Sequence, residues 1–129
     1  MHEARVVYFE DNPSFRSLIQ ILTDSYGGRH KVVAQAVNLP DTLAVLDQIA
    51  SDKLEANVVL SDGNLSPRSR GDDVRAIMGR IEELGLSVRT VLMSGQSARS
   101  MDVTVDAEVS KSSDVGSELL RVFDSLPEI

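Results

Sequence analysis

Short apolar segments rich in β-branched residues alternate along this chain with longer segments of helical periodicity. Segments of the first kind predict strands, and they cover residues 5–9, 31–36, 57–61, 89–93 and 108–110. These segments lack a regular alternation of apolar and polar residues, as expected when a sheet is covered on both faces. The pattern therefore predicts five buried strands.

Apolar residues spaced i, i+3, i+4 and i+7 predict helices between most of these strands. The expected inner faces are Phe15, Leu18, Ile19 and Leu22; Leu43, Leu46, Ile49 and Ala50; Val74, Ile77, Met78 and Ile81; and Val115, Leu119, Val122, Phe123 and Leu126. Pro40 and Asp41 open the second helix, Gly85 ends the third, and Ser113 or Asp114 can cap the last. Strands that alternate with helices predict one doubly wound α/β domain over residues 1–129, with a parallel sheet.

Composition narrows the classes of function. The chain has no cysteine, which removes disulfides, thiolate zinc sites and cysteine nucleophiles, and 13 basic against 20 acidic residues give a net charge of −7. That charge argues against direct nucleic-acid binding. No apolar run approaches the roughly 18 residues of a membrane span, and no signal peptide is recognisable, so we expect no membrane partner and a cytoplasmic location. His2 and His30 stand in polar contexts and are interpreted as surface residues.

Polar side chains follow four of the five predicted strands. Glu10 and Asp11 follow the first, Asp62 the third, Ser94 the fourth and Lys111 the fifth. The carboxyl ends of parallel strands meet at one rim, where open α/β sheets bind ligands. Each residue alone also fits an ordinary turn or cap, so the prediction of a site depends on their coincidence.

This set of residues suits phosphoryl chemistry. Three neighbouring carboxylates repel one another, and Mg²⁺ relieves that repulsion while keeping open positions for water and phosphate. A carboxylate beside the metal can act as a nucleophile, and the central Asp62 is the predicted one. An ammonium and a hydroxyl, from Lys111 and Ser94, would stabilise the transferred group.

Four segments carry a resemblance to a known family: VVYFEDNPSFRSLI (6–19), VVLSDGNLSP (58–67), VLMSG (91–95) and VDAEVSKS (105–112). In this order the chain resembles the receiver domain of two-component response regulators, of the single-domain, CheY-like kind. The resemblance implies a flavodoxin-like sheet in the order 2-1-3-4-5. Ser94 and Lys111 are only 17 positions apart, so the fourth helix is expected to be about one turn short.

The resemblance also implies a role for each residue at the rim. Asp62 would accept a phosphoryl group from a phosphohistidine. Mg²⁺ would be held by the carboxylates of Asp11 and Asp62 and by the backbone carbonyl of Asn64, with Glu10 reaching it through water.

Other roles concern the phosphorylated state. Ser94 would bond the acyl phosphate, Lys111 would pair with it, and Gly95 would leave room for it. Asn64 and Gln96 match positions that tune the rate of phosphate loss.

The sequence departs from the family pattern at several positions. Pro67 and Gly71 each lie one residue further on than usual, Glu108 stands where many receivers have Tyr or Phe, and Ser112 replaces the common Pro after Lys111. Because several of these changes fall on a surface through which many receivers signal, we expect normal phosphate acceptance with a different output.

Two alternatives stay open. One is a receiver-like protein-interaction module that signals without phosphorylation, and the other is a magnesium-dependent phosphatase. The second would need an acid two residues after Asp62, where DGN (62–64) has Asn64. A dinucleotide fingerprint G-x-G-x-x-G does not occur after the first strand.

If the resemblance holds, the only catalysis is self-phosphorylation and self-dephosphorylation. The expected partners are a sensor histidine kinase or a histidine phosphotransfer protein and an unknown downstream protein, and a homodimer is compatible with the family. The chain would be a single-domain receiver, a phosphate shuttle, or a receiver excised from a longer protein.

Overall fold

The computed structural model describes residues 1–129 except 18, 20–28, 64, 66–70 and 112–113. Its strands are β1 (Arg5–Phe9), β2 (Lys31–Ala36), β3 (Val58–Asp62), β4 (Arg89–Ser94) and β5 (Ala107–Ser110). Its helices are α2 (Leu39–Ala50), α3 (Asp72–Leu84), the 3₁₀ turn η1 (Arg99–Met101) and α4 (Val115–Ser125). Residues 13–17 and 19 are also helical. The predicted strands are therefore present within one or two residues of their expected bounds.

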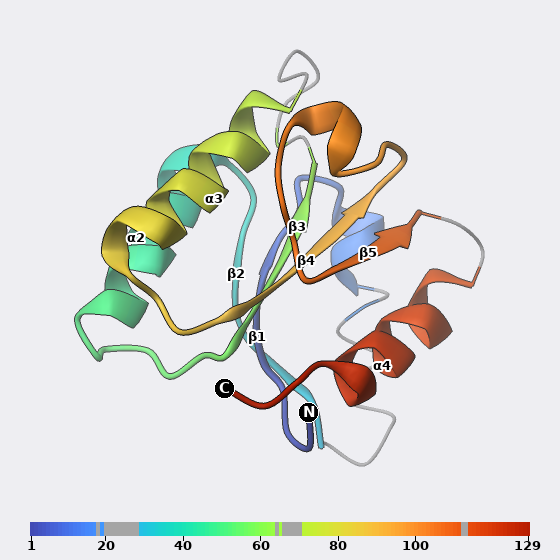
Figure 1. The fold of residues 1–129 in the computed structure, drawn as a ribbon, viewed down its shortest axis with the longest axis horizontal. Helices are drawn as coiled ribbons and strands as arrows, with labels where there is room; N and C mark the ends of the chain where they lie inside the picture. The colour runs from blue at the N-terminus through green and yellow to red at the C-terminus, as the bar shows by residue number, and fades with distance from the viewer. Residues whose placement is uncertain (18, 20–28, 64, 66–70, 112–113) are drawn as a thin grey trace.

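The five strands form one parallel sheet in the order β2-β1-β3-β4-β5. This is the predicted flavodoxin-like order, and it places β3 at the centre, between β1 and β4 (Figure 1). β1 and β3 are buried along most of their length. The strand that ends on Asp62 is thus the central strand of the sheet.

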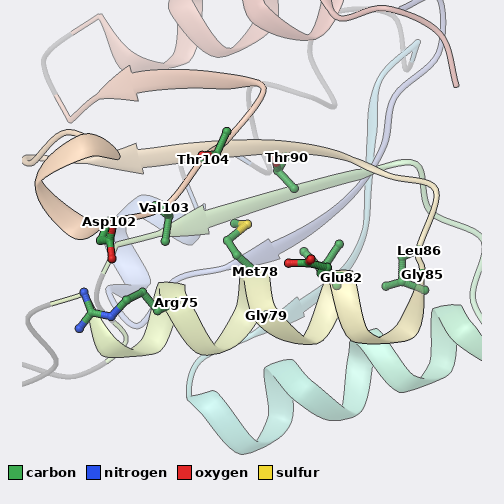
Figure 2. A pocket seen from close by; sticks show the side chains of 11 residues that line it. Arg75, Met78, Gly79, Glu82, Gly85, Leu86, Thr90, Asp102, Val103 and Thr104 are labelled. Carbon is green, nitrogen blue, oxygen red and sulfur yellow. The ribbon is translucent and has the colours of Figure 1, made fainter.

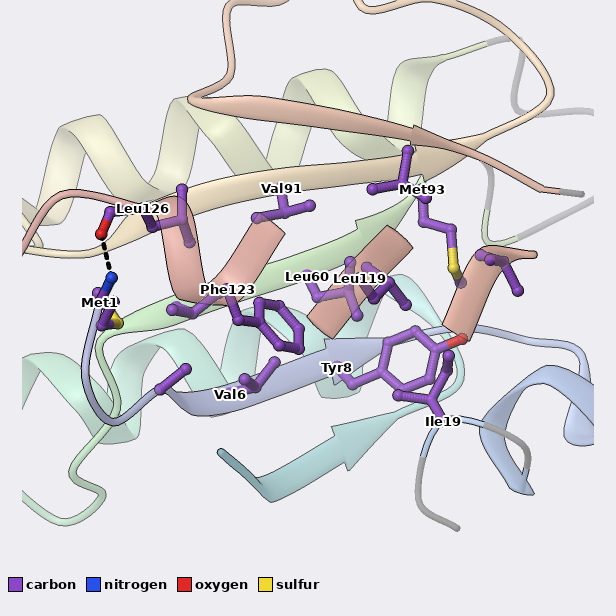
Figure 3. Packing of buried hydrophobic residues seen from close by; sticks show 14 residues of the cluster. Met1, Val6, Tyr8, Ile19, Leu60, Val91, Met93, Leu119, Phe123 and Leu126 are labelled. Carbon is purple, nitrogen blue, oxygen red and sulfur yellow. Dashed lines mark hydrogen bonds between the residues drawn. The ribbon is translucent and has the colours of Figure 1, made fainter. Parts of the chain in front are cut away.

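Helices cover both faces of the sheet, as the pattern of alternating elements predicts. α2 and α3 lie on one face, and α4 lies on the other with residues 13–17 (Figure 1). Alternate residues of β1 separate accordingly: Val7 and Phe9 pack with α2 and α3, whereas Val6 and Tyr8 pack with α4 (Figure 3). Among the described helices, none is long and apolar enough to cross a membrane.

Local signals explain most helix ends. The Asn38 side chain accepts a hydrogen bond from the Asp41 backbone N–H at 2.9 Å and caps α2, which therefore begins at Leu39, just before the predicted Pro40. Gly85 ends α3 with φ 63°, a conformation that favours glycine. Asp114 occupies the N-cap position of α4, but within the described part of the chain its side chain makes no capping hydrogen bond. The alternative cap, Ser113, lies outside the described residues.

The connection between β4 and β5, which lies wholly within the described residues, contains no α-helix. Its described regular structure is the single turn η1, which ends at Asp102 with φ 57°. A fourth helix about one turn short was expected here, but the described connection has only this 3₁₀ turn, so the shortening is larger than predicted. Met101 and Ala98 pack with Val74 of α3 and Leu92 of β4, so η1 lies on the same face of the sheet as α3.

His30 is buried, and its interpretation as a surface residue is wrong. Its side chain is only 4% exposed. Its Nδ1 accepts a hydrogen bond from Ala4 N at 2.9 Å, its Nε2 lies 2.7 Å from Asp124 Oδ1, and its ring packs edge-on against Phe123. The imidazole thus joins the start of β1 to the end of α4, through tertiary contacts that its polar sequence neighbours do not reveal.

Candidate functional site

The carboxyl ends of four strands meet at one rim of the sheet, and each carries a predicted site residue. Glu10 directly follows β1, Asp62 ends β3, Ser94 ends β4 and Lys111 directly follows β5. Because all strand pairs are parallel, these residues lie side by side. Asp62 and Ser94 are only 8% and 7% exposed, and Glu10 is fully buried. A turn at the surface would leave such residues in water, so burial favours a built site.

Three carboxylates converge at this rim. One oxygen each from Glu10, Asp11 and Asp62 lies within 4.8 Å of the others, with Asp11 exposed and the other two buried. A cluster of hard oxygen donors with one side open to solvent fits Mg²⁺, which retains several waters when it binds proteins. The fourth predicted ligand, Asn64, lies outside the described residues.

Lys111 joins two of these carboxylates. Its Nζ lies 2.8 Å from Glu10 Oε1 and 3.0 Å from Asp62 Oδ2. The same ammonium lies 4.5 Å from the centre of the Phe15 ring, a cation–π arrangement. Lys111 therefore neutralises part of the cluster's charge, and two carboxylates and an aromatic ring fix its position.

Glu10 is held by donors from several elements. Besides Lys111, the Tyr8 hydroxyl lies 3.4 Å from Oε1, and the Asn12 backbone N–H lies 3.3 Å from Oε2. Burial, and then the neighbouring Asp62, raise the pKa of Glu10 to about 7, although Lys111 acts in the opposite direction. Burial thus makes the negative charge of Glu10 costly to keep.

Besides burial, the negative charges of the cluster affect the pKa values of Lys111 and Tyr8, and both values are raised. Burial lowers the pKa of Lys111, but its hydrogen bonds to Glu10 and Asp62 and their negative charges outweigh this, so its pKa is raised. Burial, and then the charge of Glu10, raise the pKa of Tyr8. Lys111 is therefore a firmly charged ammonium, and Tyr8 is a neutral hydrogen-bond donor.

Ser94 lies beside the cluster. Its Oγ accepts a hydrogen bond from the Gln96 backbone N–H at 3.2 Å, and its carbonyl accepts one from Lys111 N at 3.4 Å. The ends of β4 and β5 are therefore joined directly at the rim. Gly95 and Gln96 are exposed. Among the described residues, no atom lies within 4 Å of an added Cβ on Gly95, so they leave this side of the site open.

Glu108 lies on β5 and contacts the segment that connects β4 to β5. It is exposed on β5 opposite Leu92, and its Oε1 accepts a hydrogen bond from the Ala98 backbone N–H at the start of η1. Glu108 therefore links β5 to the start of the segment that contains η1.

The sequence did not single out Tyr8 or Phe15 as parts of the site. Tyr8 precedes Glu10 by two positions, so the two side chains are expected on the same side of the chain. A hydroxyl on that side of a buried strand was the available signal. Phe15 was assigned to a core stripe, and nothing in its spacing indicates the ammonium of Lys111. Of the remaining departures from the family pattern, Pro67 and Ser112 lie outside the described residues. Gly71 has φ 89° just before α3, which favours glycine.

A groove of about 550 Å³ lies elsewhere, between α3 and residues 102–104 (Figure 2). Arg75, Met78 and Glu82 line it from α3, and Asp102 and Thr104 from the opposite side. None of the three clustered carboxylates lines this groove, so it is separate from the rim site.

Comparison with solved structures identifies the fold. The signal receiver domain of the response regulator NarL from Mycobacterium tuberculosis matches with a TM-score of 0.70 at 18% identity, over 98% of this chain and all of that chain. A LuxR-family two-component response regulator from Aurantimonas matches with a TM-score of 0.72 at 19% identity, over 95% of this chain and 84% of that one. The isolated REC domain of RcsB from Salmonella enterica matches with a TM-score of 0.69 at 15% identity, over 98% and 92%.

These neighbours are receiver domains of response regulators, and the chain has their fold over its whole length. No family model matches the sequence, and the search of curated proteins gives no match. At such low identities the structural likeness shows the fold alone, so the function must be argued from the rim site.

Proposed function

We propose that this chain is one receiver domain in a phosphorelay, in which Asp62 accepts a phosphoryl group. One arrangement carries the proposal: the Asp62 carboxylate ends the central strand inside a cluster that also holds Glu10, Asp11 and the Lys111 ammonium. The receiver-domain fold supports it, because that fold places these strand ends at its ligand-binding rim.

The transfer follows from the groups present. A carboxylate oxygen of Asp62 attacks the phosphorus of a phosphohistidine, the P–N bond breaks, and the imidazole leaves with the electron pair, so that an aspartyl phosphate forms. Lys111, already 3.0 Å from Asp62 Oδ2, offsets the added negative charge. Ser94 Oγ would leave the Gln96 N–H and donate its proton to a phosphoryl oxygen.

Mg²⁺ would supply charge neutralisation for the transferred group, with Asp11 and Asp62 as ligands and Glu10 behind them. Glu10 is buried and already bonded to Lys111 and the Asn12 N–H, so it is better placed to orient than to bind directly. Asn64 remains a proposed fourth ligand.

The partners follow from this chemistry. A sensor histidine kinase or a histidine phosphotransfer protein would supply the phosphoryl group, and a downstream protein would distinguish the two states. Hydrolysis of the aspartyl phosphate would reset the switch. We propose that the output involves Glu108 and η1, because Glu108 binds Ala98 at a position that lacks the usual aromatic residue.

The test is intact mass after incubation with Mg²⁺ and acetyl phosphate. We expect one phosphoryl group on the wild type and on Asp52→Asn, an exposed control, and none on Asp62→Asn or in excess chelator. Equal phosphorylation of Asp62→Asn and the wild type would rule out Asp62 as the acceptor.

One observation favours a second candidate, a module that signals without phosphorylation. Lys111 already balances part of the acidic charge, so the cluster is tolerable without a cation. This candidate predicts no adduct with any phosphodonor and partner binding that is unchanged in Asp62→Asn.

A further inference from the structure

Met101, the last residue of η1, lies directly over Gly63, the residue after Asp62. The Met101 side chain is only 1% exposed. An added Cβ on Gly63 would clash with the Met101 methyl carbon and lie 2.8 Å from its sulfur. Real side chains essentially never approach so closely, so Gly63 and Met101 form a complementary pair in which the glycine makes room for the methionine.

The Ser94 hydroxyl lies at the same place. The position of that added Cβ is also 2.8 Å from Ser94 Oγ. The end of the Met101 side chain and the Ser94 hydroxyl therefore lie against one face of Gly63. The two side chains therefore share the space beside Gly63.

Met101 is tied firmly to its surroundings through its backbone. Its carbonyl accepts a hydrogen bond from Arg75 Nη1 of α3 at 2.9 Å, and its Cβ would lie 3.2 Å from a Cβ on Gly71. The other end of η1 is held where Glu108 accepts the Ala98 N–H. Hydrogen bonds thus connect the segment that carries Met101 to Arg75 and to Glu108.

We propose that Met101 is a positioning residue that couples Ser94 to η1: it holds the Ser94 hydroxyl against Gly63 and moves with it when Asp62 is phosphorylated. The methionine thioether is flexible enough to follow such a change. The proposal rests on the proposed function, since the movement needs a phosphoryl group on Asp62. In this proposal, the buried Met101 side chain links the acceptor site at Asp62 to the surface around Glu108.

Methyl NMR tests the coupling. The chain has four methionines, and protein labelled with ¹³C in the methionine methyl groups would show one resonance for each. Met101→Leu assigns the Met101 signal. Met1, which lies before the start of β1 and packs in the core cluster on the other face of the sheet, serves as the internal reference. With Mg²⁺ and acetyl phosphate, we expect the Met101 resonance to shift clearly more than that of Met1, while intact mass reports the adduct in the same sample.

The two failures are distinguishable. An adduct that leaves the Met101 resonance no more shifted than that of Met1 overturns the coupling alone. Failure to form any adduct overturns the proposed function and the coupling with it.

A pair of variants tests the contact without phosphate. Gly63→Ala is expected to lower the melting temperature, because the added Cβ must displace the end of the Met101 side chain. Met101→Ala leaves a cavity and also lowers it, but its cost should be smaller in the Gly63→Ala background, where it relieves the clash, than in the wild type. Gly95→Ala, whose Cβ would meet no atom within 4 Å, is the stability control. An equal cost of Met101→Ala in the two backgrounds would contradict the contact between Gly63 and Met101.

A kinetic readout separates positioning from mere structure. Met101→Ala should release Ser94 and alter the lifetime of the phosphorylated form, whereas Met101→Leu, which keeps the volume, should retain the wild-type lifetime. An equal lifetime for all three proteins would show that Met101 does not position Ser94.

Discussion

The ammonium of Lys111 lies 4.5 Å from the centre of the Phe15 ring. Phe15 lies in the helical residues after β1, and Lys111 directly follows β5, so this contact joins two segments that lie far apart in the sequence. The Lys111 ammonium is attracted to the aromatic face of Phe15, and an aliphatic side chain could not supply this attraction. Phe15 is therefore expected to stabilise the position of Lys111 beside Asp62.

Phe15→Leu keeps an apolar side chain but removes the aromatic face. We expect phosphorylation by acetyl phosphate to slow by roughly 3- to 10-fold, since a cation–π contact is worth about 1 kcal/mol. Phe15→Tyr retains the ring and should stay close to the wild type. A leucine variant that is phosphorylated at the wild-type rate would show that the ring does not hold Lys111.

Lys111→Met keeps much of the lysine stem but removes the charge that joins Glu10 and Asp62. In chelator, the variant should lose about 2 kcal/mol of the free energy of unfolding, because buried carboxylates lose their cation. Mg²⁺ should recover much of this loss, because it replaces the missing charge and binds only the folded state.

Urea unfolding of the Lys111→Met variant with and without Mg²⁺ measures both effects. Lys53→Met, at an exposed lysine, is the matched control and should show neither. A stability deficit in Lys111→Met that Mg²⁺ leaves unchanged would contradict a cation site at these carboxylates.

His30 is expected to make stability depend on pH. Burial, and then the charges of Arg29, the N-terminus and His2, lower its pKa from 6.5, while Glu3 acts in the opposite direction; Asp124 faces Nε2. The unfolded state therefore takes up a proton near pH 6.5 before the folded state does. The free energy of unfolding is unaffected above that pH and falls as the pH drops below about 6.5.

His30→Asn removes this titration while its side-chain oxygen can still accept the Ala4 N–H. The variant loses the contact with the Phe123 ring, so the slope with pH is compared, not the absolute stability. Chemical unfolding between pH 5 and 8 should show a shallower slope for His30→Asn, whereas the exposed His2→Asn should keep the wild-type slope. Parallel curves for all three would disprove the assignment.

Two glycines of the α3 region should respond to alanine in opposite directions. Gly85 has φ 63° at the end of the helix and Gly79 lies inside it, and an added Cβ would meet no atom within 4 Å at either position. Gly85→Ala should cost about 1 kcal/mol because of the left-handed backbone. Gly79→Ala should gain up to about 1 kcal/mol from helix propensity, and thermal unfolding measures both. Changes of the same sign would contradict the backbone assignment.

Local patterns predicted the strands and most of the inner faces of the described helices, and the family resemblance predicted the strand order. Ala50, expected on an inner face, is exposed, and Leu18 and Leu22 lie outside the described residues. Buried strands are short and β-branched, and helices repeat every 3.6 residues, so both leave a local trace. The polar residues at the strand ends were also recognisable, because a parallel sheet brings such ends together. Glu10, Asp62, Ser94 and Lys111 lie at one rim for that reason.

What the sequence missed depends on contacts between distant segments. His30 is buried because Ala4 and Asp124 satisfy its ring nitrogens, and neither is close to it in the sequence. Met101 lies in a weakly patterned segment, and its position over Gly63 follows only from the fold. The extent of shortening between β4 and β5 was underestimated, because a single 3₁₀ turn has no periodic signature.

Locating the phosphoryl group tests the central claim most directly. Borohydride reduces an aspartyl phosphate to homoserine, and peptide mass spectrometry then identifies the modified position. After treatment with Mg²⁺ and acetyl phosphate, we predict homoserine at position 62 and at no other acid. Homoserine at Asp11 or at another exposed acid, or none while the intact protein carries phosphate, would contradict the assignment of Asp62 as the acceptor.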